Sequence, residues 1–248
     1  MSEPRLPQEA REDKARRGTC TKGTSVAAAA TPLITVSPRH DALVVVDMQN
    51  DFVRPDGPLS VPGAAEVVPV INRLCRAYRF RAVVVTKDWH PPGHCSFRRP
   101  AGPGGPWPPH CVQATAGAAL HPRLRLGNVD HVVHKGSDAD AECYSGFSDE
   151  HGKATGLAAL LREMDVRRVF ICGVAFDYCV YYTALDALKE NFEVVVLQDA
   201  TRAVFPHNVA ERSLNLQRAG VTLSSSKSLT ASMATPLGGA RTCVRPNL

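Results

Sequence analysis

The stretch 170–188, FICGVAFDYCVYYTALDAL, joins a short apolar segment to one in which apolar residues recur at helical spacing. Gly173 separates the two, and this order predicts a strand followed directly by a helix. Cys179 then lies in the first turn of the helix, where unpaired N–H groups favour a negative charge. Such a position lowers the pKa of a thiol, so we expect a reactive cysteine. A buried cysteine that only fills space is the competing interpretation.

The same alternation of apolar runs and helical patterns continues on both sides of this stretch. Strands that are apolar throughout and alternate with helices indicate an α/β fold, with a mainly parallel sheet of five or six strands and helices on both faces. The predicted strands are 42–47, 82–86, 131–135, 168–173, 193–198 and, as a sixth, 221–223. The predicted helices are 63–78, 154–164, the segment that carries Cys179, and 207–220.

Length and composition are typical of one globular enzyme-sized domain. The chain has 248 residues and a net charge of +5, and its basic residues are scattered, so we expect no nucleic acid partner. No apolar run approaches the ~20 residues that span a bilayer, and no secretory signal is recognisable, so we expect no membrane partner. The eight cysteines are then reduced thiols of an intracellular, cytoplasmic protein.

Composition changes towards both ends of the chain. Residues 1–38 are rich in charge, alanine, threonine and proline, and they predict a disordered N-terminal arm. Residues 224–248 have a similar character and predict a disordered C-terminal tail. The folded domain is therefore expected over 39–223.

Reactive side chains follow the predicted strands at the points where those strands end. Ligands of parallel α/β sheets bind at this edge, so Asp47, Lys135 and Cys179 are expected to meet there. Asp47 could accept the thiol proton and later protonate a leaving group, and Lys135 would keep Asp47 ionised and favour the thiolate. The backbone N–H groups of Ala175 and Cys179 could form an oxyanion hole. This chemistry is acyl transfer from an amide through a thioester.

A long loop, from Trp89 to about Pro122, supplies candidate metal ligands. They are Asp88, His90, His94 and His110, a carboxylate and three imidazoles that suit zinc, iron or manganese. Packing of the loop by its histidines is the competing interpretation. Cys95 and Cys111 stand beside histidines, so a closed structural zinc site is a further alternative.

Aromatic side chains in the segments after the strand ends could hold a flat substrate between their faces. They are Phe52, Trp107, Tyr144 and Phe147. Anchoring of the loops to the core is the alternative for each, and the sequence does not rank the two for Phe147. Asp199 and Arg202 are expected to cap the fifth strand.

Five segments together resemble the nicotinamidases of the isochorismatase-like cysteine hydrolase superfamily, over roughly residues 42–223. The Asp–Lys–Cys pattern is typical of the superfamily, and the Asp-Trp-His and Trp-Pro-x-His-Cys patterns are typical of its nicotinamidases. The segments are VVVDMQNDF, VVVTKDWHPPGHCSF, WPPHCVQATAGAALHP, HKGSDADAECYSGF and GVAFDYCVYYTALDAL.

The resemblance implies hydrolysis of nicotinamide, and of its analogue pyrazinamide, with NAD salvage as the setting. It implies a catalytic triad of Asp47, Lys135 and Cys179 in a doubly wound sheet that is often oligomeric, so a homo-oligomer is compatible with it. One divalent metal ion, zinc before iron or manganese, would be held by Asp88, His90 and His110, with His94 as a further ligand in some members. That ion would bind the pyridine nitrogen and water. The residues that would line the substrate pocket are Phe52, Trp107, Tyr144 and Ala175, and the Val174–Ala175 peptide would be cis.

Three other functions compete with this one. A cysteine amidase of the same fold could act on a carbamoyl or ureido substrate, although the predicted metal ligands argue against it. A catalytically dead regulator that binds metal or ligand is opposed by the intact Asp47, Lys135 and Cys179. An isochorismatase-like vinyl ether hydrolase would not need the thiol.

Overall fold

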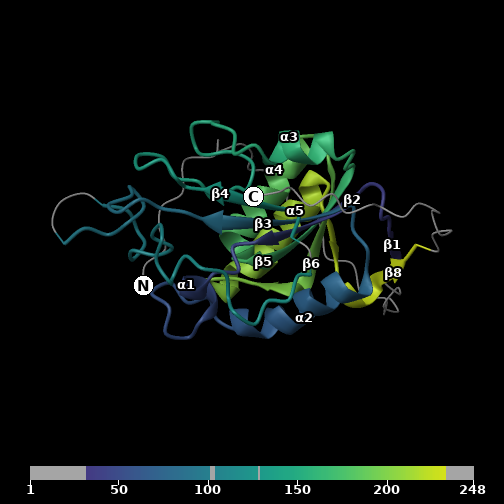
Figure 1. Ribbon diagram of the computed structural model, residues 1–248, viewed down its shortest axis with the longest axis horizontal. Helices are drawn as coiled ribbons and strands as arrows, with labels where there is room; N and C mark the ends of the chain where they lie inside the picture. Colours follow the sequence, from purple (N-terminus) through teal and green to yellow (C-terminus); the bar gives the residue numbers. More distant parts are fainter. Residues whose placement is uncertain (1–31, 101–103, 128, 233–248) are drawn as a thin grey trace, which may run out of the picture.

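A computed structural model describes residues 32–100, 104–127 and 129–232. Its centre is a six-stranded sheet in which every neighbouring pair of strands is parallel (Figure 1). In spatial order the strands are β4 (His131–Lys135), β3 (Ala82–Asp88), β2 (Asp41–Val46), β5 (Arg168–Val174), β6 (Glu193–Arg202) and β7 (Thr222–Ser224). The predicted parallel α/β sheet is confirmed. The strand predicted at 193–198 extends to Arg202.

Helices cover both faces of this sheet, as predicted (Figure 1). One face carries α1 (Asn50–Val53) and α2 (Ala64–Ala77), and the other carries α3 (Leu157–Glu163), α4 (Tyr181–Lys189) and α5 (Val209–Ala219). In β2, Val44 and Val46 point into one core while Leu43 and Val45 point into the other. A strand buried on both faces has no polar side, which explains its unbroken apolar sequence.

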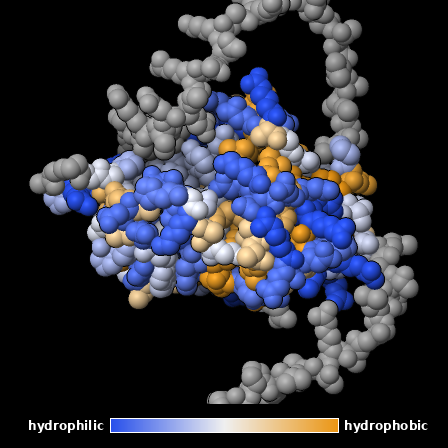
Figure 2. Space-filling view, turned by 90° about the horizontal axis from the view of Figure 1, so that it is seen from above, coloured by the Kyte–Doolittle hydropathy of each residue, from blue (hydrophilic) through white to orange (hydrophobic). Residues whose placement is uncertain are grey.

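Short helical turns complete the connections. A π-helical turn, η1 (Phe176–Val180), precedes α4, and the 3₁₀ turns η2 (Pro206–Asn208) and η3 (Ser226–Ser228) precede α5 and the last described strand. No helix among the described residues is both long and apolar enough to cross a membrane. Figure 2, a view from above, shows mostly hydrophilic residues on that face, with apolar residues between them in smaller patches.

The predicted domain limits of 39 and 223 are wrong at both ends. Strand β1 (Ile34–Val36) pairs in parallel with β8 (Leu229–Ala231), and the Tyr78 hydroxyl donates a 2.8 Å hydrogen bond to Leu229 O. These strands have three residues each, too few to show a period of two, so their sequences resemble loops. The remainder of the two predicted disordered ends, 1–31 and 233–248, lies outside the described residues.

Strands β2 and β5 approach each other closely where they end. Gly173 has φ 106°, and a Cβ atom on it would lie 2.1 Å from Val46 O. The next residue after β2, Asp47, has φ 49° in the left-handed region, which is uncommon for residues other than glycine. The two irregularities bring the ends of the central strands together at the edge where the reactive residues lie.

Candidate active site

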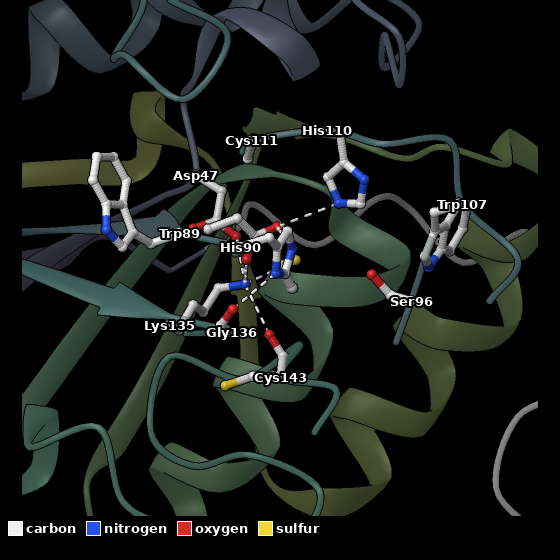
Figure 3. A network of polar contacts seen from close by, with 12 residues as sticks. Asp47, Trp89, His90, Ser96, Trp107, His110, Cys111, Lys135, Gly136 and Cys143 are labelled. Carbon is white, nitrogen blue, oxygen red and sulfur yellow. Dashed lines mark hydrogen bonds and ion pairs between the residues drawn. The ribbon is translucent and has the colours of Figure 1, made fainter. Parts of the chain in front are cut away.

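Lys135, at the end of β4, is the centre of a buried polar network (Figure 3). Its Nζ atom lies 2.9 Å from Asp47 Oδ2 and 3.5 Å from Cys179 Sγ, and it donates hydrogen bonds to Asp88 and to Cys143 O. Lys135 is 2% exposed, and Asp47 and Cys179 are buried with it. The three residues that the sequence placed at one edge of the sheet therefore do come together.

The protonation of this trio differs from the sequence interpretation. Burial raises the pKa of the Cys179 thiol, and the Lys135 ammonium only partly offsets that effect. The expected lowering of the thiol pKa is therefore wrong, because the position in the first helical turn does not reveal that Cys179 is buried. Burial lowers the pKa of Lys135, but the Asp47 and Asp88 carboxylates outweigh it and hold that pKa well above its usual range.

Asp47 has the properties of a proton acceptor. Burial raises the pKa of Asp47, against the opposing Lys135 ammonium, so its affinity for a proton is closer to that of a working general base. Its Oδ1 atom accepts a 2.7 Å hydrogen bond from the Thr86 hydroxyl. Its Oδ2 atom lies 2.9 Å from the Lys135 ammonium. An Asp47 carboxylate oxygen also lies within 4.8 Å of Cys179 Sγ, so a proton acceptor is next to the thiol.

Cys179 lies in the π-helical turn η1, which follows β5. Ala175 O accepts backbone hydrogen bonds from Tyr178 N–H at 3.1 Å and Val180 N–H at 3.0 Å, the residues on either side of Cys179. The Val174–Ala175 peptide bond is cis, as predicted. The Asp177 carboxylate, within the turn, accepts hydrogen bonds of 2.9 Å from Val204 N–H and Phe205 N–H, which joins the turn to the segment after β6.

Asp88, His90 and His110 form a second buried cluster beside Lys135. The Asp88 Oδ2 atom lies 3.6 Å from His90 Nε2 and 3.9 Å from His110 Nε2. The Nδ1 atoms of both rings lie near backbone carbonyls, those of Gly136 at 2.9 Å and Pro108 at 2.8 Å. A carbonyl only accepts, so Nδ1 carries a hydrogen in each ring, and the Nε2 atoms face Asp88.

This donor set fits a divalent metal ion. Two imidazoles oriented by backbone carbonyls, with one carboxylate, are common ligands for zinc and for iron or manganese. Burial lowers the pKa of His110 to about 4, so its lone pair is available at neutral pH. Burial raises the pKa of Asp88, but the Lys135 ammonium and His90 outweigh it, and the carboxyl group stays ionised.

His94 is outside this donor set. Its Nε2 lies 3.1 Å from Ala141 O, to which it must donate, and its Nδ1 accepts a 2.8 Å hydrogen bond from the Ser96 hydroxyl. The His94 ring packs against the His90 ring, with centroids 4.1 Å apart. Both ring nitrogens are in use, so the structure gives His94 a supporting position rather than that of a fourth ligand. The structure also does not support the closed structural zinc site that was the alternative. Neither Cys95 nor Cys111 belongs to a convergent group of metal-ligating atoms among the described residues.

A pocket opens beside Cys179 and His110. Phe52, Trp107, Tyr144 and Ala175, the predicted substrate-binding residues, all line it. Trp107 Nε1–H donates a 3.0 Å hydrogen bond to the Tyr144 hydroxyl, which fixes two aromatic walls. The aromatic faces that line the pocket suit a flat ring.

Some sequence expectations about the pocket were incomplete. Phe147 does not line it but packs in the core against Phe192, at a centroid distance of 6.1 Å. Phe52 lies in helix α1 rather than in a loop. Asp199 and Arg202 belong to β6 itself instead of capping it. The lining residues that sequence reasoning missed are Leu59, Glu142, Tyr178 and Val204. Tyr178 and Val204 had a signal, because each follows the end of a strand, whereas Leu59 and Glu142 had none.

Comparisons with known proteins agree with this geometry. A family model described as the isochorismatase domain matches residues 41–228. The nicotinamidase of Acinetobacter baylyi is 41% identical over 178 residues, which are 66% of this chain and 81% of that protein. This chain also resembles the crystal structure of PnC1 from L. infantum in complex with nicotinate, with 46% sequence identity and a TM-score of 0.78. The match covers 81% of this chain and 100% of that chain. The structure of the pyrazinamidase of Pyrococcus horikoshii in complex with zinc is 42% identical, with a TM-score of 0.67, and covers 75% of this chain and 99% of that chain.

Proposed function

The chain belongs to the isochorismatase domain family, and from this membership we propose that it is an amidohydrolase that converts nicotinamide to nicotinate and ammonia. The same reaction on pyrazinamide is expected, because this substrate is also a single nitrogen-containing ring that carries a carboxamide. One observation carries the proposal above the others. The Lys135, Asp47 and Cys179 network and the Asp88, His90 and His110 cluster share one small pocket.

The reaction begins with transfer of the Cys179 proton to Asp47. Burial keeps Cys179 protonated at rest, so the thiolate is formed only when Asp47 accepts this proton. The sulfur attacks the carboxamide carbon, and the N–H groups of Ala175 and Cys179 stabilise the oxygen that becomes negative. Asp47 returns the proton to the departing ammonia, which leaves a thioester. Asp47 then takes a proton from water, and attack of the water on the thioester releases nicotinate and restores the thiol.

Lys135 is a positioning cation in this scheme. Its ammonium lies between Asp47, Asp88 and Cys179, so it stabilises both carboxylates and the transient thiolate. No proton needs to leave Lys135, because the two carboxylates hold its pKa well above the usual range.

Asp88, His90 and His110 would hold the divalent metal ion, for which zinc is the first choice. When bound, such an ion supplies a Lewis acid that orients the ring nitrogen of the substrate and a water molecule. The chain's own residues supply the remaining specificity. Phe52, Trp107 and Tyr144 line the pocket and present aromatic faces to a flat ring.

A related cysteine amidase that acts on carbamoyl or ureido compounds is the main alternative. Such substrates have no aromatic nitrogen for a metal ion and no ring for the aromatic walls. The buried Asp88, His90 and His110 cluster therefore favours the pyridine amide. An intracellular compartment and a homo-oligomer remain predictions from the sequence and from its resemblance.

The test is ammonia release by the purified chain with nicotinamide, pyrazinamide and a ureido acid, together with metal content of the same sample. We expect turnover of both ring amides, little turnover of the ureido acid, and about one metal ion per chain. Cys179→Ala should abolish turnover while Cys75→Ala, a half-buried thiol in α2, should retain it. Equal turnover by Cys179→Ala, or turnover of the ureido acid alone, would contradict the proposal.

A further inference from the structure

Between β2 and α1, the side-chain amide of Gln49 is buried and has no role in the reaction described above. The residue is 0% exposed. Its Oε1 atom accepts a 2.8 Å hydrogen bond from Asp88 N–H, and its Nε2 atom donates to Asp88 O at 2.8 Å and to Ala118 O at 3.0 Å. One side chain thus holds both backbone groups of a residue whose carboxylate belongs to the buried metal cluster.

The early end of β2 explains why Asp88 needs this partner. In β3, Thr86 O faces β2 and accepts a 3.2 Å hydrogen bond from Asp47 N–H. Asp88, two residues further along β3, faces the same way, but β2 has already ended at Val46. The Gln49 amide takes the place of the missing strand neighbour, because an amide both donates and accepts. Asp88 is therefore held in strand geometry beyond the end of the neighbouring strand.

Asp51, in α1, makes a comparable contact with the turn that carries His110. Its Oδ2 atom accepts a 2.7 Å hydrogen bond from Cys111 N–H. Cys111 has φ 45°, a left-handed conformation that is unfavourable for a residue with a side chain, so the turn depends on contacts that hold it. Gly117 packs on the same carboxylate, since a Cβ atom there would lie 2.2 Å from Asp51 Oδ2. The carboxylate is thus confined next to the residue that follows His110.

We propose that Gln49 and Asp51 are positioning residues of the metal cluster. Gln49 holds Asp88 at the end of β3. Asp51 holds the turn that carries His110. The inference rests on the metal site of the proposed function, and it names residues that act on the ligands rather than on the ion. Because Asp47 begins the same short segment of chain, the proton acceptor and the metal ligands are positioned together.

The test is the affinity of the full chain for zinc, measured by competition with a chromophoric chelator. Removal of a group that orients metal ligands typically weakens metal binding roughly 10- to 100-fold. Gln49→Met keeps the length of the side chain without the amide, so it should weaken zinc binding at least about tenfold. Asp51→Leu removes the acceptor for Cys111 N–H and should weaken zinc binding by about as much. Asp51→Asn can accept the same hydrogen bond through Oδ1, so its zinc affinity should stay within about threefold of the wild-type value.

Asn72→Leu is the matched control, because Asn72 makes the same kind of contact in α2 without holding a residue of the cluster. Its Nδ2 atom donates to Arg123 O at 2.9 Å, and its Oδ1 atom accepts from Arg125 N–H at 2.7 Å. The control variant should unfold at a lower temperature than the wild type, because these hydrogen bonds are lost. Its zinc affinity should be that of the wild type.

The cobalt(II) form gives a readout that a general loss of stability does not move. Visible absorption of bound cobalt depends on the geometry of its ligands, so the bands should change in Gln49→Met and Asp51→Leu and not in Asn72→Leu. Should Gln49→Met fail to fold, comparison of Asp51→Leu with Asp51→Asn still decides.

Three results would contradict the proposal. Wild-type zinc affinity in Gln49→Met or Asp51→Leu would remove the role of that residue. An equal loss of affinity in Asn72→Leu, or no saturable zinc binding by the wild type, would overturn the proposal as a whole. Ammonia release is measured separately, so a chain that binds zinc in this way but does not hydrolyse nicotinamide would contradict the proposed function alone.

Discussion

The Nζ atom of Lys135 lies 2.9 Å from Asp47 Oδ2, and both side chains are fully buried. Two carboxylates, Asp47 and Asp88, therefore share one ammonium in a region that water does not reach. A buried charge without a partner is costly, so the three groups are stable only as a set. The same set brings a proton acceptor next to Cys179, which links the stability of this region to its chemistry.

Replacement of Lys135 by Met should show that link. The variant keeps the length of the side chain but leaves two buried carboxylates without a counter charge, so we expect a loss of about 3 to 5 kcal/mol in the free energy of unfolding. Turnover of nicotinamide should also be lost. Urea denaturation and ammonia release measure the two effects. Lys153→Met, which removes an exposed ion pair with Asp138, is the control and should change stability by less than about 1 kcal/mol.

Asp47→Asn tests the proton acceptor. An amide is nearly isosteric but does not take the Cys179 proton, so kcat should fall by about 10² to 10⁴. The variant should retain its fold and its metal content, because Asp47 does not belong to the cluster of Asp88, His90 and His110. On one preparation, steady-state kinetics measures kcat, circular dichroism monitors the fold, and elemental analysis gives the metal content. A kcat within threefold of the wild-type value would remove Asp47 from the mechanism.

The metal cluster makes different predictions for His110 and His94. His110→Ala removes a convergent lone pair, so metal content should fall well below one ion per chain. His94→Gln keeps hydrogen-bonding groups near Ser96 and Ala141, and the metal content should remain near that of the wild type. Elemental analysis after dialysis against a weak chelator decides between them. Equal metal loss in both variants would make His94 a ligand after all.

A comparison of Gly173 with Gly220 separates the backbone strain of a side chain at positive φ from the steric clash of its Cβ atom. The two residues have φ 106° and 107°, but a Cβ at Gly173 meets Val46 O at 2.1 Å whereas a Cβ at Gly220 has nothing within 4 Å. Gly220→Ala should therefore cost only the backbone strain, about 1 to 2 kcal/mol, and Gly173→Ala should cost at least about 2 kcal/mol more. Equal unfolding midpoints of the two variants in urea would show that β2 and β5 separate without penalty.

Trp107→Phe tests the aromatic wall of the pocket. The change keeps an aromatic ring but removes the hydrogen bond from Nε1–H to the Tyr144 hydroxyl. Tyr144 loses a partner in a partly buried position, so we expect KM for nicotinamide to rise about three- to tenfold with a smaller change in kcat. Phe147→Leu, a change in the core away from the pocket, is the control and should leave KM unchanged. An unaltered KM in Trp107→Phe would mean that the hydrogen bond does not shape the pocket.

The sheet was predictable because its signal is long and redundant. In β2, the residues that face either core are all apolar, and the same is true of most of β5. Such a sequence fits a strand that is buried on both faces. The convergence of Asp47, Lys135 and Cys179 was predictable for a related reason. Parallel strands end at one edge, and the residues that follow them must meet there.

Properties that depend on burial or on single contacts were not predictable. The pKa of Cys179 depends on how completely the turn is covered, which its own sequence does not state. His94 has the same sequence context as a ligand, and only its contacts with Ser96 and Ala141 separate it from His90 and His110. Strands β1 and β8 form by pairing with each other, and neither has a local sequence pattern that predicts a strand.

The pairing of β1 with β8 has a consequence for synthesis on the ribosome. The two strands pair at positions such as Thr35 and Thr230, whose hydroxyls lie 3.1 Å apart. These residues stand near opposite ends of the described sequence. The six strands of the main sheet are all translated before Leu229, so that sheet can assemble while β1 still has no partner. Strand β1 can pair with β8 only after residues 229–231 have been synthesised, so its edge stays open to other chains until then.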